Sequence, residues 1–204
     1  MDMMVDPTLQ TTVPADVDGI KFWPRAGAYF IDFLLLYGFT YVSSHSCVFV
    51  LRQLILIVLP IIGKSHSYLL PIPTIGNYIV AIIQTITYFA LFEWLYGRTF
   101  GKLAWGLRVI STNGDSCTLK QAFSRSVYRI VDGLFFGIVA ANYMKPPTYQ
   151  RLGDQKASTL VVSSKNAYIN QNPKWWRFII ALLVYLLADA IILAVWYSAF
   201  IRFK

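Results

Sequence analysis

Charged residues are scarce in this chain: they make up 14% of its 204 residues, against about a quarter in soluble domains. Cysteine and histidine are equally sparse. Cys47, Cys117, His45 and His66 form neither a CxxC pair nor the spacing of a metal site. We therefore expect no disulfide framework, no metal, no cofactor and no catalytic set, and the chain is not expected to be an enzyme.

A cleavable signal peptide and a phosphate loop are also missing. Residues 1–20 are acidic and contain neither a basic start nor an apolar core, so they are expected to form a polar N-terminal tail. Only three residues separate Gly97 from Gly101, and Leu103 follows Lys102. A phosphate loop needs four residues between its glycines and Ser or Thr after its lysine, so we expect these glycines to serve turns or close packing instead.

Hydrophobic residues are abundant, at 56%, and they lie in long runs. The runs at 26–43, 75–96 and 178–200 approach or exceed the roughly 20 residues that cross a bilayer as a helix. The run at 47–62 is shorter and contains Arg52, which favours an in-plane or re-entrant helix, with a tilted short span as the alternative. The sequence predicts an all-α integral membrane protein with about three transmembrane helices and further re-entrant or in-plane helices.

The polar stretch between the second and third spans has its own pattern. Thr118 and Gln121 fit a capping box, so an amphipathic helix should start there. The apolar run at 134–141 that follows is too short to span, and basic residues flank it on both sides. We expect it to dip into the membrane and return. The strand-like runs 107–110 and 158–162 would then pair on one side, as a small cytoplasmic β-hairpin element that closes a re-entrant helical hairpin.

The formal net charge of +8 is spread between apolar runs rather than concentrated on one polar domain. Basic loops of membrane proteins stay on the cytoplasmic side. This pattern favours the lipid bilayer as partner, excludes nucleic acid as the expected ligand, and predicts a cytoplasmic N-terminus.

Charges within the apolar runs are the main functional lead, because a carboxylate at bilayer depth needs a partner or water. Asp32 lies seven residues after Arg25, about 10 Å along a helix, so each needs a partner on another segment. Asp32 is interpreted either as a proton or cation site or as a clamp onto the helix that carries Arg125 and Arg129. Asp132 follows Arg129 by three residues, which favours a local ion pair.

Asp189 is more isolated, since it lies at the middle of the last span. Asp189 is interpreted either as a functional site or as a structural residue, with Arg52 or a second copy of the chain as its candidate partner. Glu93 falls near the end of the second span and is expected to be solvated at the membrane edge.

Three blocks of this sequence together resemble the RDD family of small prokaryotic membrane proteins. The first is Arg25–Asp32, with Arg at the start of a helix and Asp in its middle; the second is Gly97–Lys102, continued by Gly106–Val109. The third is Arg151–Asp154, which includes the family's second Asp. The resemblance covers roughly 20–163, and the chain departs from the family pattern by the apolar insertion at 47–62 and by a C-terminal span.

The resemblance implies a multi-span protein of the prokaryotic inner membrane, for which transport has been suggested. It divides the chain into a tail at 1–20, a membrane domain at 21–163 and a linker with a final helix at 164–204. We expect a transport component, with cation/proton exchange as its activity, acting as a homo-oligomer or with other membrane subunits. The alternative is a non-catalytic accessory or assembly subunit. The candidate residues are Arg25, Asp32, Arg125, Arg129, Asp132, Arg151, Asp154 and Asp189.

Overall fold

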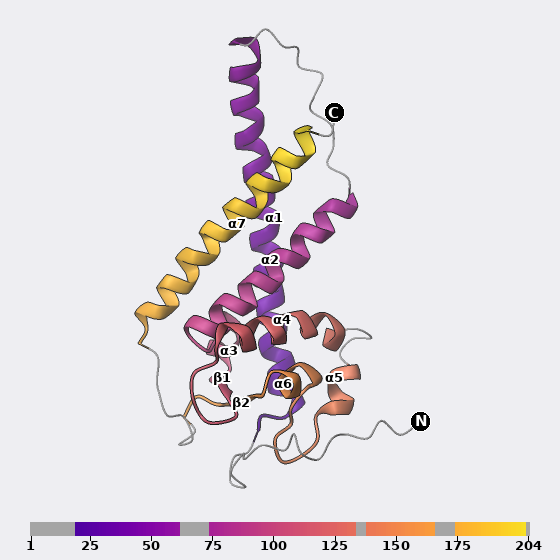
Figure 1. Cartoon of the computed structure of the whole chain (residues 1–204), viewed down its shortest axis with the longest axis vertical. Coiled ribbons are helices and arrows are strands. Elements are labelled where there is room, and N and C mark those ends of the chain that lie inside the picture. Colours follow the sequence, from indigo (N-terminus) through magenta and orange to yellow (C-terminus); the bar gives the residue numbers. More distant parts are fainter. Residues whose placement is uncertain (1–18, 62–73, 134–137, 166–173, 203–204) are drawn as a thin grey trace.

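The computed structural model describes residues 19–61, 74–133, 138–165 and 174–202. Three long helices, α1 (Phe22–Ile61), α2 (Thr74–Leu95) and α7 (Trp176–Arg202), cross one another, and a group of short elements gathers at one end of them (Figure 1). In chain order these short elements are α3 (Phe100–Ala104), β1 (Leu107–Ser111), α4 (Leu119–Gly133), α5 (Ile138–Tyr143), α6 (Leu152–Lys156) and β2 (Thr159–Ser163). We call this group the cap.

Among the described residues, two segments are long and apolar enough to cross a membrane, 78–95 in α2 and 176–196 in α7. Both helices confirm the sequence prediction to within a few residues of its bounds. They pack on each other through an aromatic cluster that includes Tyr88, Phe92 and Tyr185, with Leu36 of α1 alongside. The predicted 134–141 dip lies partly outside the described residues, which resume at α5.

The first helix corrects one prediction. α1 runs without interruption for 40 residues, about 60 Å, so the separate in-plane or re-entrant helix expected at 47–62 is wrong. The interval 44–46 between the two predicted runs contains no Pro or Gly, so it holds no residue that breaks a helix. The helix breaker of this region is Pro60, and it falls in the last turn of α1.

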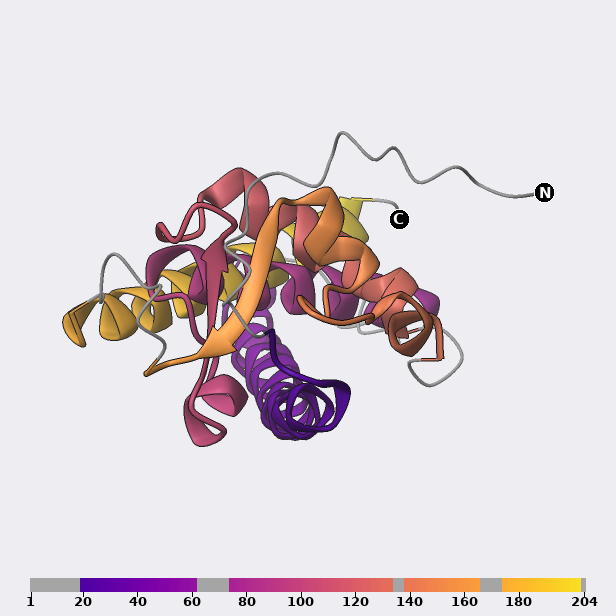
Figure 2. The same ribbon diagram turned by 90° about the horizontal axis from the view of Figure 1, so that it is seen from below.

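The cap is organised around a two-stranded antiparallel ribbon. β1 and β2 pair from Leu107 with Ser163 to Ser111 with Thr159, as their sequences predicted. The ribbon is not a hairpin, because α4, α5 and α6 lie between its strands in the chain. In Figure 2, which views the molecule from below, the ribbon crosses beside α1 seen end-on. Ile20, just before α1, donates a backbone hydrogen bond of 3.0 Å to Val161 and so fastens the start of α1 to the ribbon.

The fourth helix begins at the predicted capping box. The backbone N–H of Thr118 donates to Gln121 Oε1 at 2.9 Å, and the N–H of Gln121 donates to Thr118 Oγ1 at 3.3 Å. α4 then runs beneath α2 and places Arg125 and Arg129 against its end. The cap therefore presents a row of cations to the ends of the long helices.

Candidate functional site

Asp32 is fully buried and accepts hydrogen bonds at the N-terminus of the short helix α3. Its Oδ1 accepts hydrogen bonds of 2.8 Å from both Tyr88 Oη and the backbone N–H of Gly101, and its Oδ2 accepts one of 2.5 Å from Thr99 Oγ1. Thr99 is itself the N-cap residue of α3. Free N–H groups at a helix N-terminus favour a carboxylate, so the site satisfies the Asp32 charge without a direct cation partner. These hydrogen bonds join α1 to α2 and α3, whereas the clamp interpretation had placed the partners of Asp32 on α4.

The glycine-rich block has a steric role at this point. A Cβ on Gly101 would lie 1.9 Å from the carbonyl oxygen of Ala28, so only glycine lets α3 approach α1 closely enough for Asp32 to reach its N–H. Gly97 and Gly106 adopt φ of 75° and 63°, in the region that favours glycine. These glycines serve turns and close packing, as expected.

Glu93 corrects a second prediction, since it is fully buried rather than solvated. Lys102 Nζ and Arg129 Nη2 lie 2.9 and 2.7 Å from its Oε1, and Arg125 Nε lies 2.9 Å from its Oε2. One carboxylate at the end of α2 thus binds three cations of the cap. Sequence reasoning missed this hub, although an acid at the end of an apolar helix, followed by a basic stretch, was a signal for it.

Asp154 is the second hub. Arg25 of α1 donates to its Oδ2, Arg125 Nη1 lies 2.6 Å from its Oδ1, and the Arg151 guanidinium lies 3.7 Å away. The backbone N–H of Arg151 also donates to its Oδ2 at 3.1 Å. Because Arg125 contacts both hubs, a continuous chain of ion pairs runs from Arg25 through Asp154 and Arg125 to Glu93. We call this chain, together with Lys102 and Arg129, the ion network.

The local pair predicted between Arg129 and Asp132 is wrong. Arg129 turns to Glu93, and Asp132 lies 3.7 Å from Arg151 Nε instead. Glu93 is fully buried and binds both Arg125 and Arg129, which lie four residues apart on α4. Spacing of i to i+3 allows a contact but does not decide between it and a tertiary partner.

The electrostatics of the cap follow from burial and from these pairs. Burial alone would raise the pKa of Asp154, but Arg125, Arg25 and Arg151 outweigh it and hold that pKa well below its usual range. Burial lowers the pKa of Lys102 to about 8, although Glu93 opposes this shift. Burial raises the pKa of Asp132, which lacks a close hydrogen-bond donor in the described part of the chain. The Asp154 carboxylate is therefore a fixed charge at neutral pH.

Asp189 stands apart from this network, in the middle of α7. It is 4% exposed, and Gln84 Nε2 of α2 donates to its Oδ1 at 2.5 Å. Two more oxygens are buried close by, Gln84 Oε1 and Tyr185 Oη, and neither has a hydrogen-bond partner among the described residues. Sequence reasoning proposed Arg52 or a second copy of the chain as partner and did not foresee Gln84, an uncharged residue one helix away.

The structure brings most of the candidates together. Arg25, Arg125, Arg129, Arg151, Asp132 and Asp154 lie in or beside the ion network, Asp32 adjoins it through Thr99, and Asp189 does not reach it. Within the described ranges, no group of three or more His, Cys, Asp or Glu side chains could hold a metal ion.

Comparison with known proteins agrees with this picture of a membrane protein. A model of the RDD family matches residues 20–203, which includes α7 and all three sequence blocks. The uncharacterized membrane protein YteJ of Bacillus subtilis (strain 168) is 28% identical over 148 residues, covering 71% of this chain and 80% of that protein. No solved structure matches the chain. The three blocks are the segments that Asp32 and Asp154 join in space.

Proposed function

Since this chain belongs to the RDD family of membrane proteins, we propose that it is a transport component that exchanges a proton for a cation, with Asp189 as the exchanging group. The observation that carries the proposal is the set of buried oxygens around it: Gln84 Oε1 and Tyr185 Oη lack hydrogen-bond partners among the described residues. An ionisable residue inside an apolar span marks an ion or proton pathway by default. Carboxylate, amide and phenol oxygens suit a hard cation. A proton or a cation can occupy the carboxylate, but not both, and this competition couples the two.

The ion network is less suited to that role. Glu93 and Asp154 are bound by several cations each, and Asp32 accepts three hydrogen bonds. Releasing Glu93 or Asp154 would leave buried charges unpaired, at a cost of several kcal/mol, and releasing Asp32 would leave its three hydrogen-bond donors without their acceptor. The network therefore supports a structural role, in which it holds the cap to the ends of α1 and α2.

We also propose that the cap faces the cytoplasm of a prokaryotic cell. Lys102, Arg108 and Arg125 belong to it, and the backbone hydrogen bond of Ile20 fastens the start of α1 to it, which supports an N-terminus on the same side. α7 packs chiefly on α2, so a single chain provides few helices to enclose a pathway across the membrane. A homo-oligomer would supply more of them.

Proteoliposomes with an internal pH dye test the proposal. A cation gradient should drive a pH change with the wild type, and Asp189→Asn should reduce its rate at least about tenfold, because the amide cannot take up a proton. Asp115→Asn is the matched control: it makes the same chemical change in an exposed turn and should leave the rate unaltered. A correctly folded Asp189→Asn protein with wild-type flux would contradict the proposal.

A second candidate, a non-catalytic accessory or assembly subunit, is favoured by the outward side of α7. Leu183, Leu187 and Val195 are 59%, 63% and 61% exposed, a surface that suits lipid or the helix of another membrane subunit. Purification from native membranes in mild detergent separates the two candidates. A stoichiometric partner, together with absent flux in proteoliposomes, would support the accessory role. Neither candidate gives the chain an enzymatic activity.

A further inference from the structure

The amphipathic helix α4 is turned opposite to a helix of a soluble protein. Its apolar residues Phe123, Val127 and Ile130 are 55%, 39% and 46% exposed, whereas Arg125 and Arg129 are buried in the ion network. An exposed apolar face with a charged face turned inward is favourable only where lipid, rather than water, lies outside. This orientation suits a position of α4 at the membrane interface, with its apolar side toward acyl chains.

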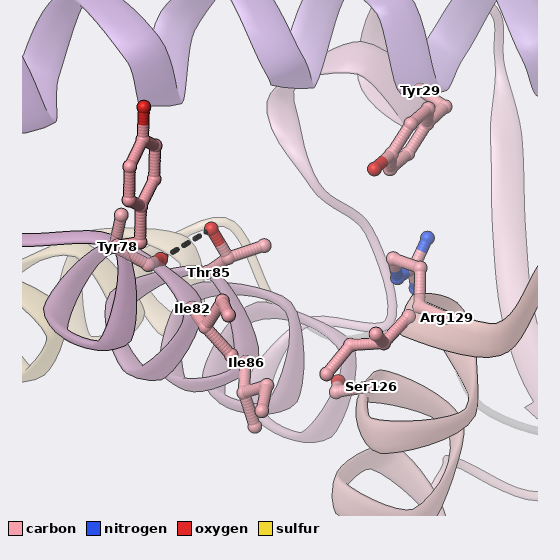
Figure 3. A pocket seen from close by; sticks show the side chains of 9 residues that line it. Tyr29, Tyr78, Ile82, Thr85, Ile86, Ser126 and Arg129 are labelled. Carbon is pink, nitrogen blue, oxygen red and sulfur yellow. Dashed lines mark hydrogen bonds between the residues drawn. The ribbon is translucent and has the colours of Figure 1, made fainter. Parts of the chain in front are cut away.

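A groove of about 210 Å³ opens beside this apolar face, between α1, α2 and α4. Figure 3 shows the lining side chains, with Tyr29 and Arg129 toward one end and Tyr78 toward the other. Its walls are Tyr29 of α1, Tyr78, Ala81, Ile82, Thr85 and Ile86 of α2, and Ser126, Arg129 and Ile130 of α4. The lining is thus sorted by polarity along the groove.

The polar end of the groove carries positive charge. The guanidinium of Arg129 points toward the ring of Tyr29 (Figure 3), and its Nε is buried with no hydrogen-bond acceptor in the described part of the chain. Glu93 takes one of its other nitrogens, but Glu93 also binds Lys102 and Arg125. Arg125 is shared with Asp154, but across the network and its neighbours five cations still face four acids, which leaves a surplus of positive charge that an anion would complement. The cations are Arg25, Lys102, Arg125, Arg129 and Arg151, and the acids are Asp32, Glu93, Asp132 and Asp154.

The lining at the other end of the groove is mainly apolar, and its two hydroxyls belong to Thr85 and to Tyr78, which is 68% exposed. Thr85 Oγ1 already donates to the carbonyl of Ala81 at 2.7 Å. Tyr78, Ile82 and Ile86 follow one side of α2 over about 12 Å. An alkyl segment laid along these side chains would be shielded from water on one side and would meet the bilayer on the other.

We propose that this groove binds one phospholipid with an anionic headgroup: the phosphate faces Arg129 and Tyr29, and one acyl chain lies along Tyr78, Ile82 and Ile86. A lipid is the occupant that fits because the cation lies at the level of the interfacial helix α4 and the apolar walls run away from it. This inference does not depend on ion exchange at Asp189, which lies on α7 and contacts Gln84 of α2.

Native mass spectrometry of the full chain, purified in mild detergent, tests the proposal. The probes are phosphatidylglycerol and phosphatidylcholine with identical acyl chains. Ile82→Trp fills the apolar part of the groove and leaves every charge in place. Ile83→Trp is its matched control, because Ile83 is 42% exposed on the same helix but does not line the groove. The wild type and Ile83→Trp should retain phosphatidylglycerol about tenfold more strongly than phosphatidylcholine, and Ile82→Trp should lose that preference.

Three results would overturn the proposal. Equal retention of the two lipids by the wild type would remove the anionic selectivity. Equal retention of phosphatidylglycerol by the two tryptophan variants would assign it to general attraction toward a basic protein. Displacement of the lipid by an equal concentration of inorganic phosphate would show that the acyl chain contributes nothing.

Discussion

Arg25, in the first turn of α1, donates a hydrogen bond to the carboxylate of Asp154 in α6, 129 residues later in the chain. Both side chains are buried, at 8% and 0% exposure. The pair closes the cap onto the start of the first helix, and Arg125 extends it to Glu93 at the end of α2. The ends of α1 and α2 are therefore held together by charges that belong to the cap.

The Glu93 hub predicts a large loss of stability on neutralisation. Glu93→Gln keeps the shape of the side chain but leaves Lys102, Arg125 and Arg129 without their shared anion. Removing one partner of a buried ion pair costs about 3–5 kcal/mol. Thermal unfolding in detergent measures the change, and Asp115→Asn, in an exposed turn, should stay within about 0.5 kcal/mol of the wild type. Equal effects of the two variants would show that the hub contributes nothing.

Acid should weaken the fold through Asp154. Its cation partners hold the pKa of this carboxyl below the usual value, so the stability it contributes is fully present above about pH 4 and is lost as the pH falls further. The stability difference between the wild type and Asp154→Asn should be constant from pH 7 to about pH 4 and should shrink below that. Unfolding measured across this range checks the prediction, and a difference that persists undiminished at low pH would refute it.

Gly101 should tolerate no side chain. A methyl group there would lie 1.9 Å from the carbonyl oxygen of Ala28 and 2.9 Å from Cγ of Asp32. Gly101→Ala must therefore separate α3 from α1 and weaken the hydrogen bond from the Gly101 N–H to Asp32. Gly38→Ala is the control, because nothing lies within 4 Å of the added atom and alanine favours the helix by about 0.5–1 kcal/mol. We expect a clear fall in melting temperature for the first variant and a slight rise for the second. Indistinguishable melting temperatures would contradict the close approach.

Local signals made much of the fold predictable. The capping box at Thr118, the apolar lengths of α2 and α7, and the strand-like runs of β1 and β2 all depend on neighbours in the sequence, and the structure confirms each of them. The resemblance also identified Arg25, Asp32 and Asp154 as a framework. It did not indicate that Arg25 pairs with Asp154 while Asp32 caps α3.

The partners could not be predicted because they are tertiary. Glu93 was interpreted as solvated because it lies near the end of an apolar span. Its position along α2 does not reveal which element covers that end, and in the structure α4 covers it. Arg129 had two acids in reach, and spacing alone favoured Asp132. Gln84 escaped notice because a neutral amide in an apolar helix carries no charge pattern that would link it to Asp189.

The double-mutant cycle of Arg25→Gln and Asp154→Asn tests the ion network most directly. Unfolding free energies of the wild type, both single variants and the double variant give the coupling between the two residues. If the pair closes the cap, the single variants are each strongly destabilised and the double variant loses less than their sum, with a coupling of about 1–3 kcal/mol. Additive losses, within about 0.5 kcal/mol, would contradict a direct interaction between Arg25 and Asp154.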